Sequence, residues 1–156
     1  MVSPIYVSNN LIRKAATEKV NLTHLKLQKL LYITYARYLY IAKNALFSNR
    51  FEAWKHGPVL TEIYDIFKIY GSKTLDIMHP DANGEVKTIV ENGNFGRCIM
   101  EVWSGFGKSS AAVLVDKTHE INSAWYNAVK SKNNKLGGFL DDAHIIKDGE
   151  KWFANG

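Results

Sequence analysis

The 156-residue sequence contains a single cysteine, Cys98, and this scarcity excludes several kinds of site. One thiol cannot build an internal disulfide framework, and it cannot supply the set of thiolates that a cysteine-built zinc site needs. Cys98 stands in the apolar, helix-like stretch RCIMEVW, where a buried and inert thiol is favoured over a nucleophile. We therefore expect a protein of a reducing compartment and predict a cytoplasmic location.

Long hydrophobic runs are also missing. The most apolar region, LLYITYARYLYIA at 30–42, is interrupted by Arg37 and four tyrosines, and it is too short for a membrane-spanning helix. The first ten residues, MVSPIYVSNN, lack the basic and apolar regions of a signal peptide. We expect no contact with a membrane.

Neither sign of charge dominates strongly. Twenty basic and fifteen acidic residues give a net charge of +5, and the basic residues are mostly lysines scattered along the chain. Dispersed lysine favours a solvated surface over a nucleic-acid interface. A nucleic-acid-binding regulatory protein of phage or prophage origin therefore stays open as an alternative that is not favoured.

Motifs of catalysis are absent or incomplete. In SGFGKSS (104–110), a phosphate-binding loop would need a glycine at position 102, where Val102 stands. None of the five histidines forms an HxxxH or HExxH pair. The sequence thus predicts no enzyme, no catalytic or metal-binding residue and no cofactor. A metal-dependent hydrolase that uses His56 and His119 is kept as a second alternative.

Helical periodicity dominates what the sequence does contain. Thr23 is a good N-cap for a helix predicted at about 23–43. This helix is apolar nearly all round, which is typical of a helix buried by neighbours on several sides. We predict a mainly α fold, a compact helical domain around this buried central helix, with a minor β-hairpin or short strands. A single domain is expected over 1–156. Only a thin edge of the central helix is expected to face water, formed by Lys26, Lys29, Ile33 and Arg37.

Shorter elements are predicted around the central helix. Ser8 or Asn9 is expected to cap the first helix, and Ser109 a later one. The helices are expected at 8–19, 61–70, 94–104, 109–119 and 123–132.

Two short β features are also expected. The segment 51–56 is predicted as a strand that can pair with the alternating EVKTIV at 85–90. Asp148-Gly149 lies between short apolar runs and predicts a two-residue hairpin turn.

The stretch FEAWKHGPVLTEIY (51–64) concentrates residues that suit a structural corner or a partner-binding surface. Gly57 and Pro58 predict a turn, beside which Trp54 offers a large rigid apolar area and His56 a polar ring. Such a turn fastens a strand onto the central helix. It can also frame a groove for a partner protein, because tryptophan and tyrosine dominate binding hot spots. Both interpretations are compatible.

A second corner is expected in LVDKTHEINSAWYNAV (114–129). It places Thr118 and His119 at the end of one helix and Trp125 at the start of the next. Two such corners in one chain indicate that they fasten helices together.

Three segments together resemble the Panacea domain, also described as the SocA-like or phage-associated GepA-like domain. LTHLKLQKLLYITYA resembles the family pattern LT-x-x-KLQKLLYF-x-x. ALFSNRFEAWKHGPVLTEIYDIF resembles LF-x-x-x-F-x-AW-x-x-GPV-x-x-x-VY, and LVDKTHEINSAWYNA resembles L-x-x-x-TH-x-x-x-PW-x-x-A. The resemblance runs in order from about Leu22 to Ala128.

The resemblance implies a non-enzymatic antitoxin that binds and neutralises a cognate toxin of a bacterial or phage toxin–antitoxin system. Members of the family pair with toxins of unrelated kinds, so the resemblance leaves open the toxin, the binding face, the oligomeric state and the choice between blocking the toxin and delivering it to a protease. The residues expected to belong to the motif or to bind the partner are Trp54, His56, Gly57, Pro58, Tyr64, Thr118, His119 and Trp125. Further motif positions are occupied by Leu27, Gln28, Lys29, Leu30, Leu31, Tyr32, Phe51, Ala53 and Val59.

Two positions depart from the family pattern. Ala124 stands where the family usually has proline before Trp125, and Ile63 stands where valine often precedes Tyr64. We expect Ala124 to loosen the corner before Trp125.

Overall fold

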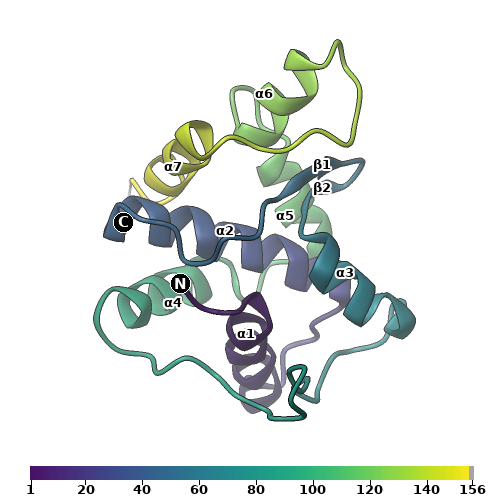
Figure 1. Ribbon diagram of the computed structural model, residues 1–156, viewed down its shortest axis with the longest axis vertical. Helices are drawn as coiled ribbons and strands as arrows, with labels where there is room; N and C mark the ends of the chain where they lie inside the picture. Colours follow the sequence, from purple (N-terminus) through teal and green to yellow (C-terminus); the bar gives the residue numbers. More distant parts are fainter. Residues whose placement is uncertain (155–156) are drawn as a thin grey trace.

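The computed structural model describes residues 1–154, and its fold is mainly α with one small sheet (Figure 1). Along the chain the elements are α1 (Pro4–Glu18), α2 (His24–Ala42), β1 (Glu52–Trp54), β2 (Gly57–Val59), α3 (Thr61–Phe67), the 3-10 turn η1 (Lys68–Tyr70), α4 (Gly93–Phe106), α5 (Ala111–Thr118), α6 (Ala124–Ser131) and α7 (Asp142–Lys151). The prediction of a mainly helical fold is confirmed. No helix within residues 1–154 is both long enough and apolar enough to cross a membrane.

Helix α2 is the centre of the molecule, as its sequence predicts. It crosses the middle of Figure 1, with α1 and α4 on one side and α7 on the other. The side chain of Thr23 accepts a hydrogen bond from the Lys26 N–H and caps the helix, as expected. The helix is buried along most of its length, so its neighbours cover it on several sides.

The expectation of a wet edge on α2 is wrong. Lys26, Lys29, Ile33 and Arg37 are all buried. Buried cations need partners, and the neighbours of α2 supply them to Arg37. Its Nε donates to Glu101 of α4 at 2.7 Å, and its Nη1 donates to the Gly149 carbonyl of α7 at 3.0 Å.

The sheet is a tight hairpin, but its turn and its pairing differ from the expected ones. The turn lies at Lys55-His56, whereas Gly57 and Pro58, predicted to form it, begin β2. β1 pairs antiparallel with β2, so that Trp54 faces Gly57 across the turn. The outer edge of β1 meets a later segment, since the Ala53 N–H donates to Gly138 and the Gly137 N–H donates to Ala53, both at 2.7 Å. β1 thus has bonded neighbours on both sides.

Residues 85–90, predicted to pair with 51–56, form no strand. Two buried asparagines of α1 hold this segment instead. The Asn9 side chain donates to the Lys87 carbonyl at 2.8 Å, and the Asn10 side chain both donates to the Ile89 carbonyl and accepts from its N–H at 2.8 Å. The first helix begins earlier than predicted, with Ser3 as its cap. The two asparagines are consequently interior residues of the helix.

Two further boundaries need correction. Ser110, rather than Ser109, caps α5. Asp148 and Gly149 lie inside α7 and form no hairpin turn. A Cβ on Gly149 would stand 2.0 Å from the Ala36 carbonyl oxygen, so the glycine allows α7 to touch the backbone of α2.

Candidate functional site

The turn between β1 and β2 brings three elements into direct contact. Gly57 has a φ of +110°, a conformation that L side chains rarely adopt. A Cβ at this position would lie 2.6 Å from Oγ1 of Thr118 on α5 and 3.0 Å from Cε of Lys29 on α2. Gly57 is therefore required both for its backbone conformation and for the close approach of the hairpin to two helices.

Lys29 lies under the hairpin and is fully buried. Its Nζ donates to the carbonyl oxygen of Pro58 at 2.7 Å, which ties α2 to β2. Burial lowers the pKa of Lys29 to about 7, because removal from water disfavours the charged form. The sequence placed this residue at the water-facing edge, since the hairpin that covers it comes almost thirty positions later in the chain.

Gln28 fixes the other end of β2. Its Nε2 donates to the Leu60 carbonyl and its Oε1 accepts from the Leu60 N–H, both at 3.0 Å. Leu60 is the N-cap residue of α3 and offers no side-chain cap of its own. The amide of Gln28 thus satisfies two buried backbone groups where the hairpin turns into the helix.

The two corners expected from the sequence are joined into one site. The indole Nε1 of Trp125, on α6, donates to the carbonyl oxygen of Trp54 at 2.7 Å. The His119 ring stacks on the Trp125 ring, with centroids 3.7 Å apart and planes 10° apart. Thr118 is buried, and its hydroxyl donates to the Val115 carbonyl at 2.8 Å.

The environment of His119 favours the neutral ring. Burial and the nearby Lys29 lower its pKa, Asp116 raises it, and His56 lowers it further. Its Nε2 is buried without a hydrogen-bond partner among residues 1–154. A neutral imidazole stacked on Trp125 acts here as a packing element.

Ala124 makes a contact that proline could not make. It is buried at the start of α6, and its N–H donates to Oδ2 of Asp148 on α7 at 3.1 Å. The same Oδ2 accepts from the Tyr32 hydroxyl at 2.6 Å. Because proline has no N–H, the departure from the family pattern adds a hydrogen bond between α6 and α7, and the expectation of a looser corner is wrong.

Asp148 is held in a site that disfavours its charge. Burial raises the pKa of Asp148 to about 6, despite the hydrogen bonds from Tyr32 and Ala124. The carboxyl links α2, α6 and α7 behind the corner, so the position of Trp125 depends on it.

An apolar groove opens beside the hairpin, and we call it the hairpin groove. It measures about 300 Å³ and lies between the start of α2, the hairpin and α3. The rings of Trp54 and Tyr64 meet edge to face at 4.8 Å, and those of His24 and Tyr64 at 5.9 Å. Its lining comprises His24, Leu25, Gln28, Trp54, Lys55, His56, Val59 and Tyr64.

Trp54 is half-buried and serves two purposes. Its carbonyl is held by Trp125, while its ring forms part of the groove lining. Tyr64 is likewise half-buried, and His56 at the hairpin tip is exposed. The sequence identified Trp54, His56 and Tyr64 as site residues. It did not identify His24, which the fold brings from the first turn of α2.

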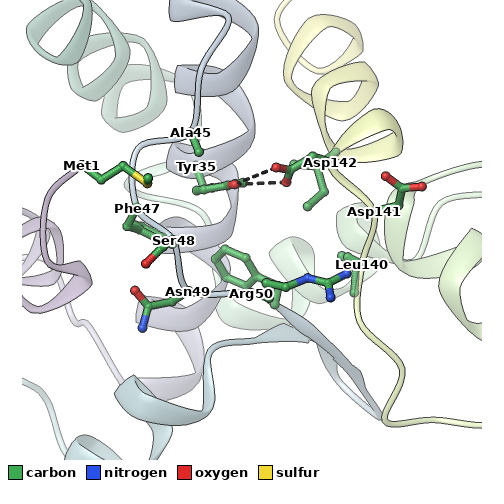
Figure 2. A pocket seen from close by; sticks show the side chains of 12 residues that line it. Met1, Tyr35, Ala45, Phe47, Ser48, Asn49, Arg50, Leu140, Asp141 and Asp142 are labelled. Carbon is green, nitrogen blue, oxygen red and sulfur yellow. Dashed lines mark hydrogen bonds between the residues drawn. The ribbon is translucent and has the colours of Figure 1, made fainter.

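A second hollow, of about 390 Å³, lies between the segment after α2 and the start of α7 (Figure 2). The Tyr35 hydroxyl points at Asp142 and donates to its Oδ1 at 3.0 Å. Burial and Asp142 raise the pKa of Tyr35, which keeps the phenol protonated. Asp141 caps α7 by accepting from the Ala143 N–H at 2.9 Å. Tyr35, Asp141 and Asp142 therefore hold the start of α7 in place.

The metal-dependent alternative finds no donor set around its two histidines. Within residues 1–154, no group of three or more His, Cys, Asp or Glu side chains could hold a metal ion. His56 is exposed at the hairpin tip and His119 is packed on Trp125.

Comparison with known proteins identifies the family of the chain. Antitoxin SocA of Caulobacter vibrioides (strain NA1000 / CB15N) is 31% identical over 148 residues, which cover 91% of this chain and 79% of that protein. No solved structure matches the chain. The model of the family described as antitoxin SocA-like, Panacea domain, matches residues 27–126, which include Gln28, Lys29, the hairpin and Trp125. The chain belongs to this SocA-like family of Panacea-domain proteins.

Proposed function

We propose that the protein is an antitoxin that binds a cognate toxin protein and neutralises it as a stoichiometric complex. The observation that carries this proposal is the family match over 27–126, together with a relative named as an antitoxin across most of the chain. The family motif residues build a rigid interaction scaffold in which the polar atoms of Gln28 and Lys29 are used within the fold.

The geometry suits binding better than catalysis. Lys29 is fully buried against a carbonyl, out of reach of a substrate, and the His119 ring is stacked on Trp125. Beside them lies a groove walled by Trp54 and Tyr64, residue types that are enriched at protein interfaces. In this proposal the protein acts by binding its partner and catalyses no reaction.

The test is co-expression with the protein encoded by the neighbouring open reading frame. We expect that protein to stop growth when expressed alone, and the antitoxin to restore growth and to copurify with it at a fixed stoichiometry. A neighbour that is harmless, or that never copurifies, would overturn the proposal. A mobility-shift titration with DNA and RNA at low salt tests the nucleic-acid alternative, for which we expect no shift.

A further inference from the structure

The backbone around the hairpin groove is held by hydrogen bonds from behind. The Trp54 carbonyl accepts from Trp125, and two hydrogen bonds between Gln28 and Leu60 hold the turn into α3. A surface that is already rigid loses little conformational entropy on binding. The backbone on which the groove is built is therefore ordered before a partner binds.

Two polar groups of the groove are already engaged within the fold. The Gln28 amide is satisfied by the Leu60 backbone, and the Trp54 indole N–H faces Glu52 at 3.4 Å. The apolar part of the lining is formed by Leu25, Trp54, Val59 and Tyr64. About 300 Å³ is the lower limit for a small-molecule pocket, and it suits one large apolar side chain.

The lining of the groove carries basic residues and no acid. No carboxylate is present in its lining, whereas Lys55 and His56 are exposed at the rim. On the adjoining elements, Asp65 pairs with Lys68 at 3.2 Å, Glu52 accepts from the Trp54 indole, and Glu62 is exposed on α3. His24, also in the lining, has a buried Nδ1 with no hydrogen-bond partner among residues 1–154. A carboxylate next to the inserted side chain would match this rim.

We propose that the hairpin groove is the surface on which this protein holds its toxin, and that its occupant is a large apolar side chain of the toxin with an Asp or Glu carboxylate beside it. This inference rests on the function proposed above. The apolar side chain fills the space between Trp54 and Tyr64, and the carboxylate meets Lys55 and His56.

Two substitutions test the two parts of the inference. Leu25→Trp fills the groove from its α2 side, where Leu25 is half-buried. Lys55→Glu reverses the rim charge at an exposed turn position. The matched control is Lys147→Glu, which makes the same charge change at an exposed position on α7, away from the groove.

The dissociation constant of the antitoxin–toxin complex is measured by biolayer interferometry for each variant after thermal unfolding has verified its fold. We expect Leu25→Trp to weaken binding at least about thirtyfold, the scale of a hot-spot loss. Lys55→Glu should weaken binding about tenfold at low salt and less at high salt, while Lys147→Glu should bind like the wild type. If Leu25→Trp does not fold, the comparison of Lys55→Glu with Lys147→Glu still decides whether the groove binds the toxin.

The outcomes separate this inference from the proposed function. Failure of the wild type to bind the toxin would remove both. Tight binding by the wild type, Leu25→Trp and Lys55→Glu alike would leave the antitoxin function standing and overturn the groove as its binding surface. Sedimentation of the free protein provides a further check: self-association that Leu25→Trp abolishes would assign the groove to a second copy of this chain and overturn the proposal.

Discussion

Lys29 offers the sharpest test of the structure, because a buried amine makes the stability of the protein depend on pH. The substitution Lys29→Met keeps a long apolar side chain and removes the titrating group. In the wild type the pKa of Lys29 is lowered to about 7, from an ordinary value of 10.5. Between these values the unfolded chain binds the proton and the folded chain does not, so the free energy of unfolding rises with pH.

The magnitude follows from proton linkage. Each pH unit in this window is worth up to about 1.4 kcal/mol. From about pH 7.5 to about pH 9.5, Lys29 alone should raise the free energy of unfolding by roughly 2.5 kcal/mol. At pH 7.5 we expect Lys29→Met to be the more stable protein, although it leaves the Pro58 carbonyl without its donor at a cost of about 1–3 kcal/mol. Its advantage should shrink as the pH rises.

The assay is urea unfolding followed by tryptophan fluorescence at the two pH values. Wild type, Lys29→Met and the exposed control Lys147→Met are compared, so that the titrations of Cys98 and the tyrosines, common to all three, cancel. We expect Lys147→Met to show the wild-type dependence on pH and Lys29→Met to lack the rise of about 2.5 kcal/mol. Equal pH dependence in wild type and Lys29→Met would show that Lys29 keeps an ordinary pKa and is not buried under the hairpin.

Three further predictions concern the supports of the site. Gly149→Ala should destabilise the protein by more than about 2 kcal/mol in urea unfolding, because the new Cβ would meet the Ala36 carbonyl at 2.0 Å; Gly105→Ala, in a helix with open space around it, should stabilise by up to about 1 kcal/mol. Gln28→Ala should cost about 2–4 kcal/mol by leaving both Leu60 backbone groups unsatisfied, and a loss below about 1 kcal/mol would contradict their burial. Because the pKa of Asp148 is raised to about 6, its carboxyl stabilises the protein fully at acidic pH, and this stabilisation is lost as the pH rises through 6. Between about pH 4 and pH 7, the free energy of unfolding of Asp148→Asn should therefore rise relative to that of the wild type by up to about 3 kcal/mol in the same assay.

The sequence predicted the central helix well for a physical reason. The N-cap preference of Thr23 and the continuous apolar surface that follows it are local signals, and the helix at 24–42 differs from the predicted 23–43 by a single residue at each end. The turn next to Trp54 is also a local signal, but its predicted position is wrong by two residues: the turn lies at Lys55-His56, and Gly57-Pro58 begin β2. Signals that lie within one turn of the chain can be recognised from the sequence alone.

The errors arose where distant groups compete for the same backbone or side chain. EVKTIV alternates like a strand, but its carbonyls are occupied by Asn9 and Asn10 from α1. The sequence predicts that Lys29 and Arg37 face water, because nothing nearby in the chain shows that Pro58 will bind Lys29 and that Glu101 will bind Arg37. Gly149 looked like a turn residue because the close approach to Ala36 exists only in the folded molecule.

The residues that line the hairpin groove fall into two groups according to their positions in the family pattern. Gln28, Trp54, Val59 and Tyr64 occupy defined positions of the family pattern and form the walls. The pairs His24-Leu25 and Lys55-His56 occupy the two unspecified positions in LT-x-x-KLQ and in AW-x-x-GPV, and they form the rim.

Wall residues are tied into the fold, as Gln28 is to Leu60 and as Trp54 is to Trp125, so changing them alters stability before it alters binding. Rim residues are tied less closely, since Lys55 and His56 are exposed and Leu25 is half-buried. A scaffold built in this way can change the shape and charge of its groove at little cost to folding. That property suits a family whose members, by resemblance, face toxins of unrelated kinds, and under the proposed function it assigns the choice of partner to the rim.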